Sequence, residues 1–169
     1  MSSRKIARTA IFAALICAAA PLSVSVGPIP VSLATFAIYL AAATLGKKLG
    51  TVAVVVYILI GLAGFPVFSG FGAGLSKIVG VSGGFIVGYV PLAFITGWSV
   101  EFRRTWKYLV GMVLGTIVLY AFGTAWYSAL TGSNRTASIA VCVLPFLPGD
   151  AVKIIAAYKL TVNGLRVDR

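Results

Sequence analysis

The sequence predicts an all-α membrane protein with six transmembrane helices, a short broken segment before the last helix, and irregular external loops. The composition, the long apolar runs and the placement of positive charge support this fold class. Of the 169 residues, 60% are hydrophobic and 10% are charged, and the mean hydropathy is +1.04. Because soluble domains carry about 25% charged residues, this composition favours a lipid bilayer as the solvent.

Six apolar runs follow one another, and each approaches the roughly 20 residues that cross a bilayer core. They cover residues 6–22, 31–45, 52–68, 83–100, 108–130 and 136–160. Pro145 and Pro148 interrupt the last run, so we expect a short element, a turn and then a helix beginning near Asp150. The basic start of the first run resembles a signal peptide. However, the run continues past Pro21 into the next one, and we expect it to be retained.

The net charge of +11 follows the topology of a membrane protein. With the amino terminus inside and six crossings, both termini are cytoplasmic and only three basic residues lie outside: Lys77, Arg135 and Lys153. The other eleven lie inside: Arg4, Lys5, Arg8, Lys47, Lys48, Arg103, Arg104, Lys107, Lys159, Arg166 and Arg169. This bias predicts a plasma-membrane protein, and no nucleic-acid-binding motif accompanies it.

Residues 1–169 form one domain without linkers, and they offer little for catalysis or metal binding. The chain has no histidine, and its acids are Glu101, Asp150 and Asp168. Two of these acids fall in inner segments, so no paired carboxylates or nucleophile–base pair can be assembled. Cys17 and Cys142 lie in separate apolar runs and are expected to be core thiols. We predict a protein that is not an enzyme, with no metal site and no cofactor.

The predicted outer segments are rich in glycine and proline. Residues 64–84 contain seven glycines, and residues 23–30 contain two prolines and a glycine. Irregular backbone at membrane depth is tolerated where protein buries it or where it lines a wet cavity. The segments therefore indicate an external pocket with a lid, although each glycine also fits a tight turn or close helix packing. The candidate substrate contacts here are Ser69, Gly70, Gly72, Gly74, Ser82, Gly83 and Gly84.

Asp150 and Lys153 are the charged residues of the motif Pro145-Phe-Leu-Pro-Gly-Asp-Ala-Val-Lys153. An ionisable group at membrane depth is costly and usually has a partner or a function. Asp150 suits a helix N-cap, but a lysine in the first helical turn opposes the helix dipole and needs an anion nearby. The pair is either a cap with a salt bridge or a ligand site, and we favour the ligand site.

Three alanines of the first run, Ala10, Ala14 and Ala18, recur every four residues and form one flat stripe on a helix. Ala13 and Ala20 are expected to widen that surface. Small residues permit close approach of another helix. Helix physics leaves two interpretations open, which are packing inside the bundle and docking of a partner protein.

Several motifs resemble the biotin-specific S components, the BioY type, of energy-coupling factor (ECF) transporters. These are Val26-Gly-Pro-Ile-Pro-Val-Ser-Leu-Ala-Thr35, Gly61-Leu-Ala-Gly-Phe-Pro-Val-Phe-Ser-Gly70, Gly80-Val-Ser-Gly-Gly-Phe85 and the motif from Pro145 to Lys153. The resemblance covers nearly the whole chain. It implies a six-helix subunit that binds biotin from outside and associates with a transmembrane coupling protein (T component) and two cytosolic ATPases.

The resemblance also implies residue roles. Asp150 and Lys153 match the family's vitamin contacts, and Ala10, Ala14 and Ala18 match the stripe that docks the coupling protein. The chain departs from the family at Ala34, where glutamine is common, and at Gly72 and Ile86, where some members carry asparagine and arginine. Two alternatives therefore stay open. One is an S component for a related vitamin or precursor such as dethiobiotin, and the other is a small channel or assembly protein.

Overall fold

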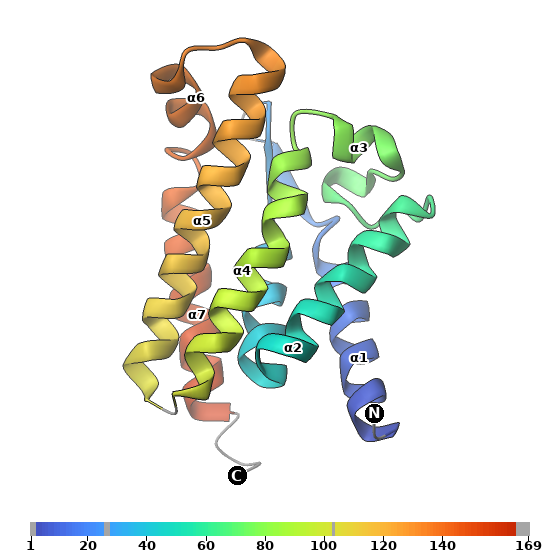
Figure 1. Cartoon of the computed structure of the whole chain (residues 1–169), viewed down its shortest axis with the longest axis vertical. Helices are drawn as coiled ribbons and strands as arrows, with labels where there is room; N and C mark the ends of the chain where they lie inside the picture. Colours follow the sequence, from blue (N-terminus) through green and yellow to red (C-terminus); the bar gives the residue numbers. More distant parts are fainter. Residues whose placement is uncertain (1–2, 26–27, 103, 165–169) are drawn as a thin grey trace.

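The protein is an elongated helical bundle, seen in a computed structural model that describes residues 3–25, 28–102 and 104–164 (Figure 1). Its helices are α1 (Ser3–Ala19), α2 (Ala34–Leu62), α3 (Leu75–Val79), α4 (Gly83–Glu101), α5 (Thr105–Thr131), α6 (Arg135–Cys142) and α7 (Leu147–Gly164). A short 3-10 turn, η1 (Ser69–Phe71), precedes α3. Two strands, β1 (Ser23–Ser25) and β2 (Pro30–Ser32), form an antiparallel hairpin in which Val24 pairs with Val31.

The long element α2 consists of two helices joined at Gly46. Gly46 has φ of 76°, a conformation that favours glycine, and the chain changes direction there (Figure 1). Beyond this break, Gly50 packs so closely on Ala42 that a Cβ at Gly50 would lie 2.8 Å from the Ala42 Cα. The two parts therefore correspond to the second and third apolar runs of the sequence.

The predicted interruption of the last run is confirmed. Helices α6 and α7 meet at a bend of 48° across a break of no more than four residues. By length and composition, α2, α4 and α5 are each able to span a membrane, and the bent α6–α7 pair counts as a fourth candidate span. The mostly helical fold class is thus confirmed, and the count of six crossings stays a prediction.

The two ends of the bundle differ in structure (Figure 1). The break in α2, the α4–α5 connection, the start of α1 and the end of α7 lie at one end. The hairpin, α3 and α6 lie at the other. The expectation of irregular external loops was wrong for the first loop, because Ser23 to Ser25 pairs with Pro30 to Ser32 as a ladder. Pairing satisfies backbone groups that an irregular loop would leave without partners.

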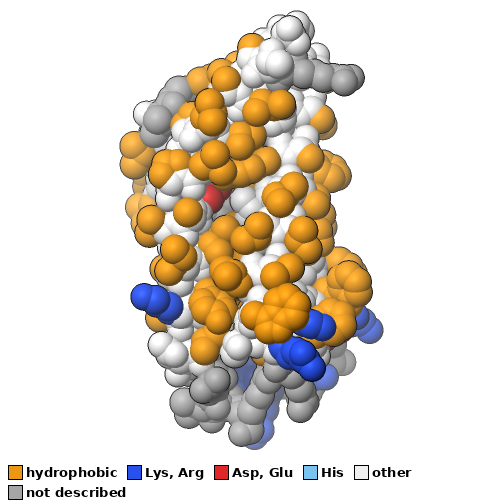
Figure 2. Space-filling model, turned by 90° about the vertical axis from the view of Figure 1, so that its left-hand side faces the viewer, with side chains coloured by type: hydrophobic (Ala, Val, Ile, Leu, Met, Phe, Trp, Pro, Cys, Tyr) orange, Lys and Arg blue, Asp and Glu red, His pale blue; other side chains and the backbone are white. Residues whose placement is uncertain are grey.

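The interior is apolar and includes large side chains from four helices: Ile16, Ile38, Tyr39, Tyr57, Leu92, Met112 and Leu119. The outer surface is also largely hydrophobic, as the space-filling view shows along the length of one face (Figure 2). Soluble monomers seldom expose apolar patches beyond a few hundred Å². Together with the apolar helices, this surface indicates a membrane protein.

Lysine and arginine side chains gather toward the lower end of the face shown in Figure 2. This is the end that carries the α2 break and the α4–α5 connection, where Lys47, Lys48, Arg104 and Lys107 occur. The predicted inner charges Arg103, Arg166 and Arg169, and the carboxyl of Asp168, lie outside the described residues. The observed placement agrees with the charge pattern from which the topology was predicted.

Candidate functional site

Asp150 and Lys153 form a buried ion pair near the start of α7. The Lys153 Nζ lies 3.0 Å from the Asp150 Oδ1, and the two side chains are 11% and 4% exposed, respectively. Asp150 accepts two more hydrogen bonds, from the Tyr120 hydroxyl at 2.7 Å and from the Thr35 hydroxyl at 3.3 Å. Three helices, α2, α5 and α7, therefore contribute donors to one carboxylate.

The expectation that Asp150 caps its helix was wrong. Helix α7 begins at Leu147, and the Asp150 amide already donates to the Phe146 carbonyl at 2.8 Å. Pro148 lies in the first turn of the helix and does not precede it. A proline is tolerated there because it lacks only an amide that would have no helical partner. The Asp150 side chain is thereby free to point toward α5 and α2.

Lys153 is held by acceptors from β2 and from the start of α2 as well as by Asp150. Its ammonium donates to the Ser32 carbonyl at 2.6 Å and to the Thr35 hydroxyl at 3.3 Å. Ser32 ends strand β2, so the hairpin is tied directly to α7. Because α7 begins at Leu147, Lys153 lies in the second helical turn, whereas the first was expected from the sequence. These acceptors and Asp150 supply the partners that a buried cation needs.

A small, partly enclosed cavity of about 20 Å³ lies beside the pair. Its polar lining includes the side chains of both charged residues and of Ser69 and Ser82, which belong to the glycine-rich outer segment. The rest of the lining is largely apolar and aromatic: Ile29, Pro30, Phe85, Ile86, Tyr89, Leu119 and Phe146. An apolar cavity with a few convergent polar groups is the usual form of a small-molecule site.

Four predicted site residues line this cavity, namely Asp150, Lys153, Ser69 and Ser82, whereas the predicted glycines are not among its lining residues. Gly70, with φ of 66°, belongs to η1, and Gly74, with φ of 77°, immediately precedes α3. Gly83 makes room for the Ile78 carbonyl, and Gly84 makes room for Trp126 of α5. The Trp126 indole donates to the Gly80 carbonyl at 3.0 Å. These glycines permit tight turns and close packing around the cavity. Their contact with a ligand stays a prediction, as does that of Gly72.

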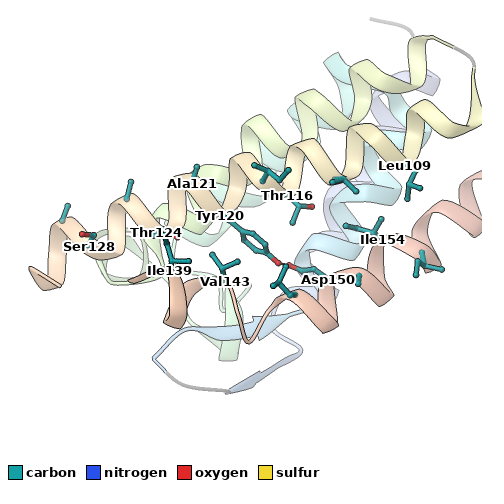
Figure 3. A pocket seen from close by; sticks show the side chains of 17 residues that line it. Leu109, Thr116, Tyr120, Ala121, Thr124, Ser128, Ile139, Val143, Asp150 and Ile154 are labelled. Atoms are coloured by element: carbon teal, nitrogen blue, oxygen red, sulfur yellow. The ribbon is translucent and has the colours of Figure 1, made fainter. Parts of the chain in front are cut away.

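A much larger hollow, of about 1050 Å³, lies between α5 and the α6–α7 pair. Figure 3 shows Tyr120 and Asp150 pointing toward one another inside it, with Ile139 and Val143 nearby. Tyr120 and Asp150 line the hollow and the small cavity alike, so their hydrogen bond stands between the two. The hollow is wide and almost entirely apolar. It suits lipid chains better than a polar solute, which leaves the small cavity as the candidate site.

The alanine stripe of α1 faces outward. Ala10, Ala14 and Ala18 are exposed, whereas Ala13 and Ala20 are 2% and 0% exposed inside the bundle. The expectation that these last two widen the surface was therefore wrong, because Ala13 lies on the inward side of α1 and Ala20, which directly follows the helix, is buried as well. The interpretation that the stripe packs within the bundle is likewise wrong, and docking of a partner protein stays a prediction.

The sequence analysis did not identify Thr35, Tyr120 or Ser32 as site residues. A tyrosine in the middle of the run 108–130 is the one signal that could have drawn attention to α5. Nothing in the sequence indicates that it meets Asp150, thirty positions away. Thr35 and Ser32 stand within the quoted motif of the first outer segment.

Metal binding has no support in the part of the chain that the structure describes. No group of three or more histidine, cysteine, aspartate or glutamate side chains occurs among those residues. The donors around Asp150 are hydroxyls and an ammonium, and an ammonium repels a cation. The arrangement suits a neutral or anionic organic molecule with N–H donors.

Comparison with known proteins identifies the family. The model of the BioY family matches residues 1–167. The chain belongs to the BioY family. The probable biotin transporter BioY of Pyrococcus horikoshii is 36% identical over 157 residues, covering 93% of each chain. The biotin transporter BioY of Thermotoga maritima is 36% identical over 169 residues, covering 98% of this chain and 99% of its own.

A solved structure of an S component for biotin has the same fold. The crystal structure of the S component for biotin from an ECF-type ABC transporter superposes with a TM-score of 0.91 at 25% identity. The match covers 100% of this chain and 96% of the other. The resemblance expected from the motifs is thereby confirmed, and the BioY fold places Asp150 and Lys153 beside a cavity.

Proposed function

We propose that this BioY-family chain is the substrate-binding membrane subunit for high-affinity biotin uptake. It captures biotin from outside and delivers it through an ATP-driven ECF transporter. The observation that carries the proposal is the match over the full chain to the S component for biotin, in a protein whose largely apolar cavity has a buried ion pair in its wall. The names of the relatives from Pyrococcus and Thermotoga support the same substrate.

The Asp150 carboxylate is the proposed acceptor for the ureido N–H groups of biotin. A carboxylate offers about four acceptor positions, and Lys153, Thr35 and Tyr120 fill three of them. One N–H group can therefore bind directly, and a second binds where one of the protein hydroxyls withdraws. Lys153 serves the ureido oxygen or the valerate of the vitamin. Ser69, Ser82 and the neighbouring glycines provide further contacts.

Binding requires the cavity to expand. Ligand pockets usually measure about 300–1,000 Å³, whereas the cavity beside the ion pair measures about 20 Å³. The hairpin residues Ile29, Pro30 and Ser32 cover it on one side. The hairpin and η1 are therefore the proposed lid, which moves to admit biotin and then returns.

The proposed topology places six crossings in the plasma membrane with both termini in the cytoplasm. The two parts of α2 supply two crossings, and the bent α6–α7 pair supplies one. The start of α1 and the end of α7 lie at the same end of the bundle, as an even number of crossings requires (Figure 1). The basic residues at that end agree with the positive-inside rule.

The proposed partners are a transmembrane coupling protein (T component) and two cytosolic ATPases. The exposed stripe of Ala10, Ala14 and Ala18 is the docking surface for the coupling protein. We expect Ala14→Arg to leave biotin binding intact and to abolish co-purification with the coupling protein, because an arginine blocks close helix approach. Retained co-purification would contradict this docking surface.

Titration of the purified protein with biotin tests the proposed function. Trp126 lies at the outer end and donates to the Gly80 carbonyl, so its fluorescence is expected to report ligand binding. Asp150→Ala is expected to weaken biotin binding at least tenfold, because hydrogen bonds to a charged group are worth about 1.5–3 kcal/mol each. Unchanged affinity by calorimetry would refute the site. Tighter binding of dethiobiotin than of biotin would reassign the substrate.

A further inference from the structure

Lys77 of α3 is a half-buried cation near the candidate site, and it takes no part in the Asp150–Lys153 ion pair. Its ammonium donates to the Ser69 carbonyl at 3.3 Å, and its own carbonyl accepts from the Ser82 hydroxyl at 3.4 Å. Ser69 and Ser82 both line the cavity. Lys77 therefore lies directly behind the part of the cavity wall that the glycine-rich segment provides.

The described lysines differ in their counterions. Lys153 pairs with Asp150, and Lys47 pairs with Glu101 at the opposite end of the bundle. Lys77 lies within 4.0 Å of no carboxylate in the described part of the chain, and its ammonium has one backbone carbonyl as its acceptor. Because Asp150 and Lys153 neutralise one another, Lys77 leaves the cavity region with one excess positive charge.

The position of Lys77 depends on a glycine. The Lys77 side chain passes over Gly72, where a Cβ would lie 2.1 Å from the lysine Cε. Gly72 itself has ordinary extended backbone angles, φ of −73° and ψ of 155°. Backbone conformation therefore does not require glycine at position 72, whereas the path of the Lys77 side chain does.

Resting on the proposed function, we propose that Lys77 binds the carboxylate of biotin and sets the preference of the site for an anionic ligand. The ureido end meets Asp150 on α7, and the opposite, negatively charged end meets the ammonium on α3. The Lys77 ammonium has a single carbonyl contact, on the cavity-lining residue Ser69, and a ligand carboxylate would take the place of that carbonyl. The site thus holds two cations with different tasks, since Lys153 is already matched by Asp150.

The test compares biotin with its neutral carboxamide on wild-type protein and on Lys77→Gln. We expect Lys77→Gln to weaken biotin about threefold to fivefold, the upper part of the range for a partly exposed charge pair, and to change carboxamide binding less than twofold. Lys48→Gln, which removes an exposed lysine at the opposite end of the bundle, is the matched control and is expected to change neither affinity.

Gly72→Ala supplies an independent variant, because its Cβ displaces the Lys77 side chain without straining the backbone. Gly72→Ala should reduce the preference for biotin over its carboxamide. The double variant Gly72→Ala with Lys77→Gln should lose no more biotin affinity than Lys77→Gln alone. Equal losses for both ligands in Lys77→Gln, or no loss for either, would overturn the assignment while biotin binding itself stands. Failure of wild-type protein to bind either compound would overturn the proposed function and this assignment together.

Discussion

The described part of the chain includes two lysine–carboxylate pairs of nearly equal length in opposite surroundings. The Lys153–Asp150 pair at 3.0 Å is buried, receives two further hydroxyl donors and adjoins a cavity. The Lys47–Glu101 pair at 2.9 Å has side chains that are 28% and 47% exposed, respectively. It joins the break in α2 to the end of α4, at the other end of the bundle. Distance alone does not distinguish them, but burial and the surrounding donors do.

We expect the two pairs to differ in role, with the exposed pair merely tolerated by the fold and the buried pair used by the proposed binding site. Exposed ion pairs contribute about 0–1 kcal/mol to stability. Buried pairs are poor stabilisers, because the cost of removing two charges from water offsets their attraction. The buried pair is held by three further residues, Thr35, Tyr120 and Ser32. We therefore infer that it serves ligand recognition rather than the stability of the fold.

The largest expected effect comes from breaking the buried pair. Lys153→Met leaves the Asp150 charge with hydroxyl donors alone, and an uncompensated buried charge costs about 3–5 kcal/mol. We expect a clear fall in the thermal midpoint in detergent and loss of biotin binding. An unchanged midpoint would show that water reaches Asp150 freely, against the burial described above.

A smaller effect is expected from Tyr120→Phe, which removes one donor and keeps the charge pair. Stability should fall by about 1.5–3 kcal/mol, the value of a hydrogen bond to a charged group. Biotin affinity should change less than threefold, because a ureido N–H can take the vacated position on Oδ2. Tyr127→Phe, two turns along the same helix, is the matched control. A tenfold loss of affinity in Tyr120→Phe would mean that the hydroxyl itself contacts biotin.

The smallest effect is expected from Glu101→Gln at the exposed pair. The unfolding free energy should change by less than about 1 kcal/mol. Biotin titration should give the wild-type affinity, because the pair lies at the end of the bundle away from the cavity. A loss of affinity here would indicate that the two ends are coupled.

The sequence predicted those features of the fold and the site that depend on residues close together in the chain. The apolar runs predicted helices, Pro145 and Pro148 predicted the bend, and the motif around Asp150 predicted the charged site. These signals are local, since each depends on residues close together in the chain. Helix α7 nevertheless begins three residues before the expected start, because proline is as compatible with a first helical turn as with a preceding loop.

The rest of the site depends on contacts that no local pattern specifies. Thr35 and Tyr120 reach Asp150 across 115 and 30 positions, and only the packing of α2, α5 and α7 brings them together. The β1–β2 hairpin carries a Ser-Val alternation typical of strands, but the prolines beside it favoured a loop. The relation between Gly72 and Lys77 likewise becomes visible only when the side chain is placed.

The most direct test of the central claim uses the double variant Asp150→Asn with Lys153→Met, which removes both charges of the buried pair at once. We expect this protein to recover most of the thermal stability lost in Lys153→Met, since no lone charge stays buried, and still to bind biotin at least tenfold more weakly than wild type. Wild-type affinity in a folded double variant would contradict the claim that these two charges recognise the ligand.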